Sequence, residues 1–342
     1  MKFFLSLSVL AICLSSCGGT QTQNSESQND TTDLAAGKIK VIIDSDANNE
    51  LDDQHALAYT FFNGDVFDVK GVTVNNTRNG DGIEGQYEEA VRVAKLCDVY
   101  PEIPVIKGAA GNYDQIKGNI DQPDFDGQEA VDFIIETARA NTGDPLILLP
   151  IGKLTNIALA LLKAPDIIDK VEVVWLGSNY PNAGEYNLDN DTTSVNPVIE
   201  SGVHFEMAVV RYAAPTGTGA VRVTRETIQE KMPDAGPEVS PPVEGRHGGE
   251  FTNFGDYSVN LFEKANMHGD PPSRALFDMA AVAVVKNPAW ADKVEIPAPK
   301  LQGNDWVQKP ENQNSIYIWE NFAIDPILAD FFETMHDFHL VE

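Results

Sequence analysis

Five carboxylates lie within ten residues near the start of the chain. The stretch VIIDSDANNELDDQHALAYTFF, residues 41–62, contains Asp44, Asp46, Glu50, Asp52 and Asp53. Like charges at this spacing repel one another, so either full solvation of an acidic loop or a bound cation must compensate them. Carboxylate oxygens suit Ca²⁺ or Mg²⁺, whereas zinc sites are typically built from thiols and imidazoles. The residue types therefore favour a hard divalent cation.

The elements on either side of these acids favour the cation over the solvated loop. An apolar run at residues 39–44 predicts a buried strand, and Asp44 and Asp46 stand at its carboxyl end. Asp52 and Asp53 open a predicted helix, where the helix dipole favours negative charge. No dipole relieves the two acids at the strand end. In open α/β sheets, ligands bind in the crevice beyond the carboxyl ends of the strands.

The rest of the chain alternates between strand-like and helix-like segments. This pattern predicts an α/β fold with a mostly parallel central sheet and helices on both faces, a Rossmann-like open sheet. A segment rich in Pro and Gly at 239–251 is typical of a mobile loop. No internal repeat is visible, so 38–342 is predicted to be one domain. Strands are expected at 39–44, 67–74, 104–106, 146–150, 171–176 and 207–210, and helices at 52–62, 83–97, 128–141 and 154–162.

The amino-terminal segment is predicted to be a targeting signal rather than part of the fold. MKFFLSLSVLAICLSSC has a basic start, an apolar run too short for a permanent membrane span, and small residues before Cys17. It resembles a bacterial lipoprotein signal, which implies cleavage after residue 16 and lipidation of Cys17. An ordinary secretory signal is the alternative, and both imply export. Residues 17–37 are polar and predict a flexible tether to a membrane anchor.

Composition restricts the class of partner. The net charge of −28 is unsuited to nucleic acid, because phosphate binding requires a basic face. The expected link to the membrane is the lipid on Cys17. Loss of Cys13 with the signal would leave Cys97 as the free thiol, so no disulfide is expected in the mature chain. The fold must therefore depend on its hydrophobic core.

Four blocks in order along the chain resemble the inosine/uridine-preferring nucleoside hydrolase family. The first, DSDANNELDD at 44–53, is similar to the family's D-x-D-P-G-x-D-D, but its loop is two residues longer and lacks Pro-Gly. The similarity spans residues 39–285, most of the predicted domain. The other blocks are LLPIGKLTNIA at 148–158, WLG at 175–177 with EYN at 185–187, and FDMAAVA at 277–283.

The resemblance implies a Ca²⁺ ion at the bottom of a pocket, where it holds the 2′- and 3′-hydroxyls of a ribose. The positions that match the metal ligands are Asp46, Asp53, Asp278 and the backbone carbonyl of Ile151. Asp46 also matches the general base that takes a proton from water. The family's substrate-binding groups match further positions. One ribose contact and one contact on the 5′ side each have two candidate asparagines. These positions are Asp52, Asn187, Glu185, Asn75 or Asn76, and Asn179 or Asn182.

One position departs from the purine-processing branch of the family. That branch has a histidine before the last metal-binding aspartate, where it helps to protonate the leaving base, and this chain has Phe277. A phenyl ring donates no proton, so His247 and His268 are the alternative candidates for the acid. Phe277 is instead expected to line an apolar slot for the base.

The implied function is calcium-dependent hydrolysis of ribonucleosides or a related N-riboside to base and ribose. Carboxylates around the sugar would stabilise its oxocarbenium-like transition state. A non-catalytic ribose-binding lipoprotein is the alternative that the changed loop and Phe277 favour. A phosphatase of the haloacid dehalogenase type is disfavoured, because Ala47-Asn48 follow Asp46 in place of the usual hydroxylated residue. The base specificity stays open, and family members often form homo-oligomers.

Overall fold

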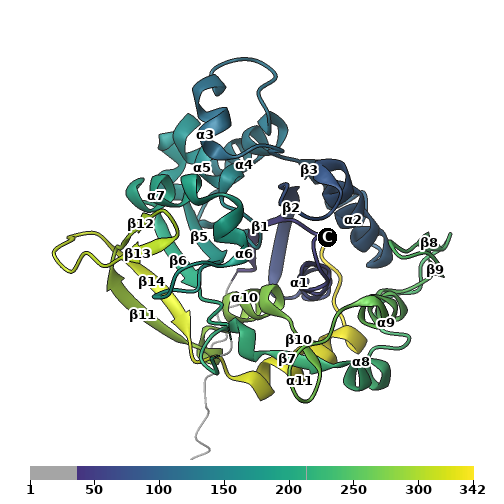
Figure 1. Cartoon of the computed structure of the whole chain (residues 1–342). Helices are drawn as coiled ribbons and strands as arrows, with labels where there is room; N and C mark the ends of the chain where they lie inside the picture. Colours follow the sequence, from purple (N-terminus) through teal and green to yellow (C-terminus); the bar gives the residue numbers. More distant parts are fainter. Residues whose placement is uncertain (1–36, 213) are drawn as a thin grey trace, which may run out of the picture. The chain divides into compact units, whose positions relative to one another are not determined.

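The apolar, β-branched runs form the centre of one eight-stranded sheet (Figure 1). The computed structural model describes residues 37–212 and 214–342, and within them the strand order is β11-β14-β6-β5-β4-β1-β2-β3. All neighbours pair in parallel except β11, which is antiparallel to β14. The strands are β1 (Ile39–Ser45), β2 (Phe67–Val74), β3 (Val105–Lys107), β4 (Leu146–Pro150), β5 (Val171–Leu176), β6 (His204–Ala208), β11 (Asp292–Pro297) and β14 (Ser315–Glu320).

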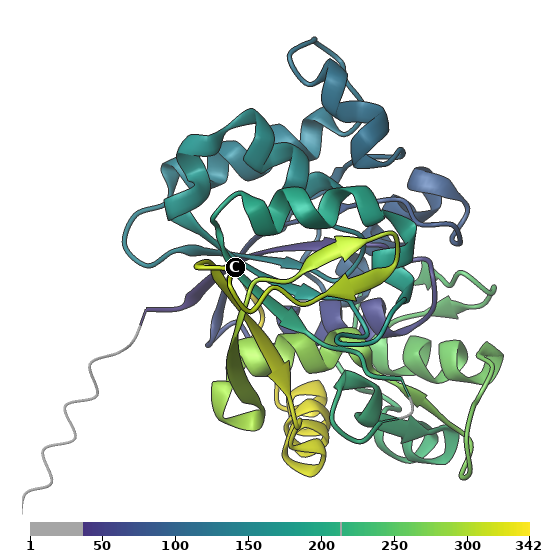
Figure 2. The ribbon, with the colours of Figure 1, turned by 60° about the vertical axis from the view of Figure 1, so that its left-hand side comes forward.

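Alternate residues of each strand enter two separate hydrophobic cores, as expected for a sheet covered on both faces. In β1, Val41 and Ile43 belong to one core and Ile42 belongs to the other. Figure 2 shows teal helices on one side of the sheet and green and yellow helices on the other. One layer contains α4 (Gln128–Ala140), α5 (Thr155–Lys163) and α7 (Thr192–Glu200), and the other α1 (Asp52–Phe61), α2 (Gly82–Leu96), α10 (Phe277–Lys286) and α11 (Ile324–His336).

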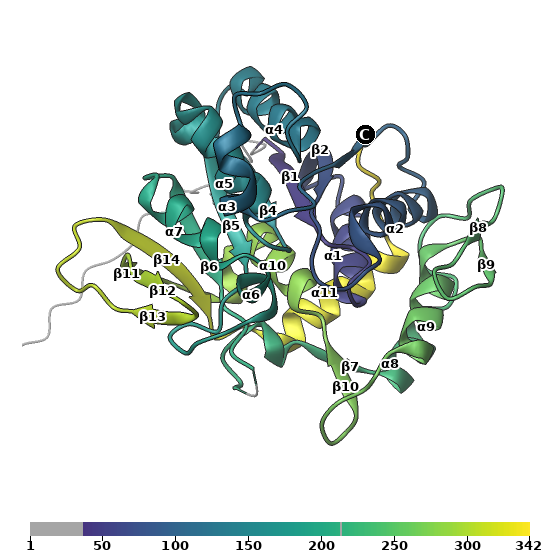
Figure 3. The same cartoon turned by 45° about the horizontal axis from the view of Figure 1, so that its top comes forward.

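The predicted fold class is confirmed, and most element boundaries agree within three residues. The edge strand β11, its neighbour β14 and the last helix, α11, were not predicted. The segment at 239–251 contains a short hairpin, β8 (Val243–Glu244) with β9 (Glu250–Phe251), instead of an irregular loop. It lies beside α9 (Phe254–Lys264), at the right of Figure 3. Two other small sheets pair β7 (Arg222–Thr224) with β10 (Ser273–Ala275) and β12 (Lys300–Gln302) with β13 (Asp305–Val307).

Residues Lys38–Glu342 form one compact unit. The predicted signal, the tether and the lipidation site at Cys17 lie outside the described residues. Among the described helices, none is long and apolar enough to cross a membrane. Cys97 is buried and unpaired in the described part of the chain.

Candidate active site

The carboxyl ends of the central strands converge on one cavity of about 330 Å³. β1 leads through a short loop into α1, whose first residues are Asp52 and Asp53. Ile151 directly follows β4, and Asp278 is the second residue of α10. These side chains come from distant parts of the sequence and line the same cavity. The crevice expected at the strand ends is therefore present.

Three carboxylates from two helices meet at the floor of the cavity. One carboxylate oxygen from each of Asp52, Asp53 and Asp278 lies within 4.8 Å of the others, and all three residues are buried. Asp46 lies beside them, because its backbone N–H donates to Asp53 Oδ1 over 3.2 Å. The Asp46 carboxylate accepts a 2.6 Å hydrogen bond from Thr77 Oγ1.

Burial and mutual repulsion make these acids resist ionisation. Burial, and next the Asp52 carboxylate, raise the pKa of Asp53 to about 8. Burial raises the pKa of Asp52 to about 6. The pKa values of Asp46 and Asp278 are both raised well above the usual range, chiefly by burial and then by Asp53 and Asp52 respectively. Without a bound cation, these acids therefore tend to keep their protons, because no basic side chain of the described residues pairs with them.

A bound divalent cation would supply the positive partner that these four aspartates lack. None of the ion pairs within residues 37–212 and 214–342 involves Asp46, Asp52, Asp53 or Asp278. Buried carboxylates normally require a paired cation or a metal ion. The donor set is entirely oxygen, which suits Ca²⁺ or Mg²⁺. The cluster contains Asp52 in addition to the predicted ligands Asp53 and Asp278.

Asp44 has a different role from the other acids of the opening motif. It is fully buried and accepts hydrogen bonds from Thr73, Asn75 and Asn156 at 2.7–3.0 Å. These bonds join the ends of β1 and β2 to α5, so Asp44 fixes the strand ends below the cavity. Gly152 packs against them so closely that a Cβ there would come within 2.9 Å of Asp46 Oδ1. This close approach explains the glycine after Ile151.

Most of the predicted site residues do line the cavity. Asn187 donates to the carbonyl of Ile151 over 2.8 Å and to that of Leu176 over 3.1 Å. Glu185 caps α6 (Tyr186–Asn190) by accepting from Leu188 N at 3.0 Å, and burial raises its pKa. The predicted residues that line the cavity are Asp46, Asp52, Asp53, Ile151, Glu185, Asn187, Phe277 and Asp278.

The predicted asparagine contacts other than Asn187 lie outside the cavity lining. Asn75 is fully buried and turns inward to Asp44, over 3.0 Å. Asn76 lines a separate cavity with Thr77 and Arg78. Asn179 accepts from the backbone N–H of Tyr212 over 3.1 Å, and Asn182 is exposed. The shortened sequence after β2 places Thr77, rather than either asparagine, against Asp46.

The two candidate histidines differ in position, because only one of them lines the cavity with the carboxylates. His268 lines the cavity with the carboxylates, whereas the exposed His247 lines a neighbouring cavity. The structure therefore places His268, and not His247, on the main cavity wall. His55, inside α1, is fully buried and hydrogen-bonds Leu51 O and Ser258 Oγ at 2.6 and 2.7 Å. Its role is structural.

Several lining residues were missed from the sequence. Some of them lie inside the motif blocks at positions that carried no predicted role, and the others come from segments without a motif. Tyr212 packs edge-on against Phe277 with ring centroids 5.9 Å apart. Arg222 and Arg274 come from the paired strands β7 and β10. The unpredicted lining residues are Asn49, Glu50, Leu176, Tyr186, Tyr212, Arg222, Arg274 and Ala275.

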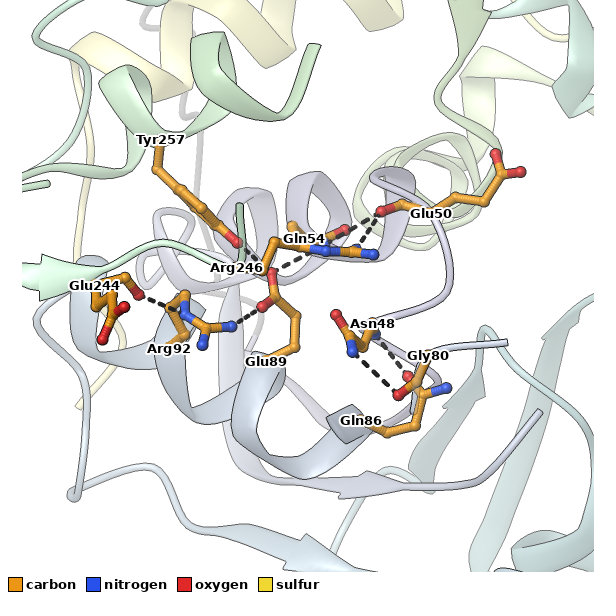
Figure 4. A network of polar contacts seen from close by, with 10 residues as sticks. All are labelled: Asn48, Glu50, Gln54, Gly80, Gln86, Glu89, Arg92, Glu244, Arg246 and Tyr257. Carbon is orange, nitrogen blue, oxygen red and sulfur yellow. Dashed lines mark hydrogen bonds and ion pairs between the residues drawn. The ribbon is translucent and has the colours of Figure 1, made fainter. Parts of the chain in front are cut away.

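A polar network fixes the long loop between β1 and α1, which carries the acids (Figure 4). The backbone N–H of Asn48 donates to Gln86 Oε1 over 2.6 Å, and its side chain donates to Gly80 O over 3.0 Å. Arg246, from the β8–β9 hairpin, donates to Glu50 O over 2.7 Å. The loop that replaces the Pro-Gly turn is therefore held by side chains from α2 and from the hairpin.

Deeper in the same network, a buried carboxylate joins three helices (Figure 4). Glu89 of α2 is fully buried and accepts from Tyr257 Oη at 2.5 Å and from Gln54 Nε2 at 3.0 Å. Arg92 forms an ion pair with Glu89 and donates to Glu244 O over 2.6 Å. These contacts connect α1, α2 and α9 with the hairpin, so they orient the start of α1 where the metal-site aspartates stand.

Comparison with known proteins agrees with this geometry. The chain matches the family described as inosine-uridine preferring nucleoside hydrolase over residues 41–323. The pyrimidine-specific ribonucleoside hydrolase RihB of Escherichia coli is 29% identical over 195 residues, which are 50% of this chain and 59% of that protein. An uncharacterized protein of Schizosaccharomyces pombe is 36% identical over 119 residues, 32% of this chain and 37% of that protein. The matched region thus spans about 37–59% of these two relatives.

Solved structures show the same fold. A plant nucleoside hydrolase superposes with a TM-score of 0.67 at 16% identity, covering 87% of this chain and 99% of its own. A purine-preferring ribonucleoside hydrolase from Gardnerella vaginalis gives 0.64 at 21% identity, covering 86% and 98%. The match of the family pattern to most of the described domain, together with this fold, shows that the chain belongs to the inosine-uridine preferring nucleoside hydrolase family.

Proposed function

We propose that this protein is a calcium-dependent hydrolase that cleaves the N-glycosidic bond of ribonucleosides or a related N-riboside. The observation that carries the proposal is the buried, uncompensated group of Asp46, Asp52, Asp53 and Asp278 at the floor of the cavity. Family membership supports the reaction type. The pyrimidine-specific name of one relative and the purine-preferring name of one structural neighbour leave the base open.

Asp53 and Asp278, with Asp52 or Asp46 and the carbonyl of Ile151, would hold the cation. A divalent ion there supplies positive charge that orients the ribose diol and makes a neighbouring water more acidic. Asn187 Nδ2 donates to that carbonyl and to Leu176 O, so its Oδ1 is left to accept from a sugar hydroxyl. Glu185, the N-cap of α6, lines the same cavity and supplies a further acceptor.

Asp46 is placed to act as the general base. One of its oxygens accepts from Thr77, which orients the carboxylate at the cavity floor. Burial and Asp53 raise its pKa, and a proton acceptor is most effective when its pKa approaches the working pH. The remaining carboxylates would stabilise the positive charge that develops on the sugar ring.

The opposite wall must accommodate the departing base. Phe277 and Tyr212 form its aromatic part, and Phe277 donates no proton. His268, Arg222 and Arg274 are the cationic or titratable groups on that wall. They would stabilise negative charge on the leaving base without a histidine at position 277.

Phe277 also favours a second function, a ribose-binding protein with little turnover. One assay separates the two. Ribose release is measured with uridine, inosine and p-nitrophenyl β-D-ribofuranoside, with and without chelator. Release that stops with chelator and resumes with Ca²⁺ supports the hydrolase. Tight, Ca²⁺-dependent binding of uridine without ribose release supports the binding protein, and phosphate release from phosphoesters would contradict both.

We also propose that the protein is exported and anchored through lipid on Cys17, on the basis of the sequence at 1–37. Metabolic labelling with an alkyne fatty acid should mark the wild-type chain in the membrane fraction. The Cys17→Ser variant should lose the label. A labelled Cys17→Ser chain would contradict the assignment.

A further inference from the structure

A second cavity of about 310 Å³ lies beside the first and shares part of its wall. Asn49, Glu50, His268 and Arg274 line both cavities. The shared wall includes His268 and Arg274, which the proposed function places beside the leaving base. The residues that line only the second cavity come from the end of the β1–α1 loop, the β8–β9 hairpin, α9 and the segment after α9. They are Leu51, Arg246, His247, Leu261, Lys264, Ala265 and Asn266.

The second cavity has the opposite charge from the first. Arg246, Lys264 and Arg274 line it, and Glu50 is its one acidic lining residue in the described part of the chain. The same cations affect His247, whose pKa is lowered by burial and by Arg246 and Lys264. A basic cavity is unexpected on a chain with a net charge of −28. It therefore indicates selection for an anion at this place.

Arg274 is the group of this wall that most needs an anionic partner. Its side chain is 9% exposed and forms an ion pair with Glu50, whose side chain is 46% exposed. A buried guanidinium requires a paired acceptor, and burial lowers the pKa of Arg274. Glu50 reaches Arg274 from the loop between β1 and α1. The backbone carbonyl of Glu50 accepts a hydrogen bond from Arg246, and this bond holds the loop. The half-exposed carboxylate is thus a replaceable partner for Arg274.

We propose that Arg274, Lys264 and Arg246 form an anion subsite that binds an acidic group on the leaving base, displacing the carboxylate of Glu50. The preferred substrates are then N-ribosides whose base carries a carboxylate. This inference rests on the proposed hydrolase function for the position of the ribose. Guanidinium groups bind carboxylates with strong, charge-assisted hydrogen bonds, so the subsite selects for that group over a neutral base.

The test compares 5-carboxyuridine with uridine, which differ only in the carboxylate. With the full-length protein and Ca²⁺, we expect kcat/KM to be about tenfold higher for 5-carboxyuridine. Lys264→Met should lower this preference about threefold or more, and Glu50→Gln should raise it, because it removes the competing carboxylate. Lys300→Met removes a similar exposed lysine that pairs with Glu200 on another hairpin, and it should leave the preference unchanged.

The possible outcomes test the anion subsite and the hydrolase activity independently. Equal kcat/KM for the two nucleosides, or a preference that Lys264→Met and Glu50→Gln leave unaltered, overturns the subsite while the hydrolase stands. Absence of ribose release from both overturns the hydrolase. Calorimetric titration of the same two nucleosides then decides the subsite: tighter binding of 5-carboxyuridine that weakens in Lys264→Met supports it, and equal binding overturns it.

Discussion

Within residues 37–212 and 214–342, two groups of side chains have the residue types of a metal site, and they differ in how their charge is balanced. Asp52, Asp53 and Asp278 meet beyond the carboxyl ends of the strands, and Glu172, His204 and Glu206 meet on β5 and β6, nearer their amino ends. In each group the ligand atoms lie within 4.8 Å of one another. Proximity alone therefore does not distinguish them.

The second group is already satisfied by its neighbours. Glu206 forms an ion pair with Lys293, accepts from Trp319 Nε1 at 2.5 Å and contacts His204 Nε2 at 2.6 Å. His204 in turn stacks on Tyr317 with ring centroids 5.0 Å apart. These contacts account for the buried carboxylate of Glu206 without a metal ion.

The first group has no such partner, and this contrast supports the proposal that it holds the metal ion. The hydrogen bonds to Asp53 come from Ser45 and the backbone N–H of Asp46, both neutral groups, and its pKa is raised to about 8 by burial and Asp52. Natural cores rarely retain buried negative charge without a counter-ion. The useful criterion is therefore uncompensated charge, not the number of nearby ligands.

The largest expected difference between the two groups is in activity, when one carboxylate is removed from either group in separate variants. Asp53→Asn should lower kcat/KM for ribose release by about 10²–10³-fold, because it weakens both cation binding and charge stabilisation. Glu172→Gln makes the same change of charge in the second group and should alter kcat/KM less than about twofold. Steady-state ribose release measures both. Similar losses in the two variants would remove the distinction between the groups.

Metal addition should stabilise the protein through the first group alone. At free Ca²⁺ of 100 times Kd, binding contributes about 2.7 kcal/mol to the free energy of unfolding. Thermal unfolding in chelator and in Ca²⁺ measures the shift. We expect the shift to persist in Glu206→Gln and to disappear in Asp278→Asn. A shift retained by Asp278→Asn would place the ion elsewhere.

Disrupting the second group should affect stability rather than chemistry. Glu206→Gln removes the charge that Lys293 and His204 contact, at a cost of about 1–3 kcal/mol. Urea unfolding measures the loss, and kcat for the remaining folded protein should match the wild type. Preserved stability combined with reduced kcat would contradict the structural role of this group.

Part of the first group's surroundings could be predicted from the sequence. The run before Asp44 and the acids that open α1 are local signals, so the first strand and the first helix were predicted. The family resemblance, not a local signal, implied that Asp278 joins Asp53. The family relation and the fold class are confirmed.

Features that depend on packing were not predictable from sequence. Arg274 reaches the cavity only because β10 pairs with β7, and the parallel pairing of β14 with β6 depends on residues more than 100 positions apart. Asn75 has a residue type that suits ribose binding, yet it is used to hold Asp44. Whether a polar side chain faces the ligand or the protein depends on the tertiary structure around it.

The smallest effect, and the one most specific to uncompensated charge, is a pH dependence. The pKa values of Asp52 and Asp53 are raised to about 6 and about 8, so the folded state holds protons that the unfolded chain releases near pH 4. In chelator, the free energy of unfolding should therefore fall as pH rises from 5 to 8. Ca²⁺ competes with those protons, so its stabilising effect should be larger at pH 8 than at pH 5. Thermal unfolding at both pH values, with Asp53→Asn as the comparison, measures this difference. Equal Ca²⁺ stabilisation at the two pH values would mean that the carboxylates are already compensated, as they are around Glu206.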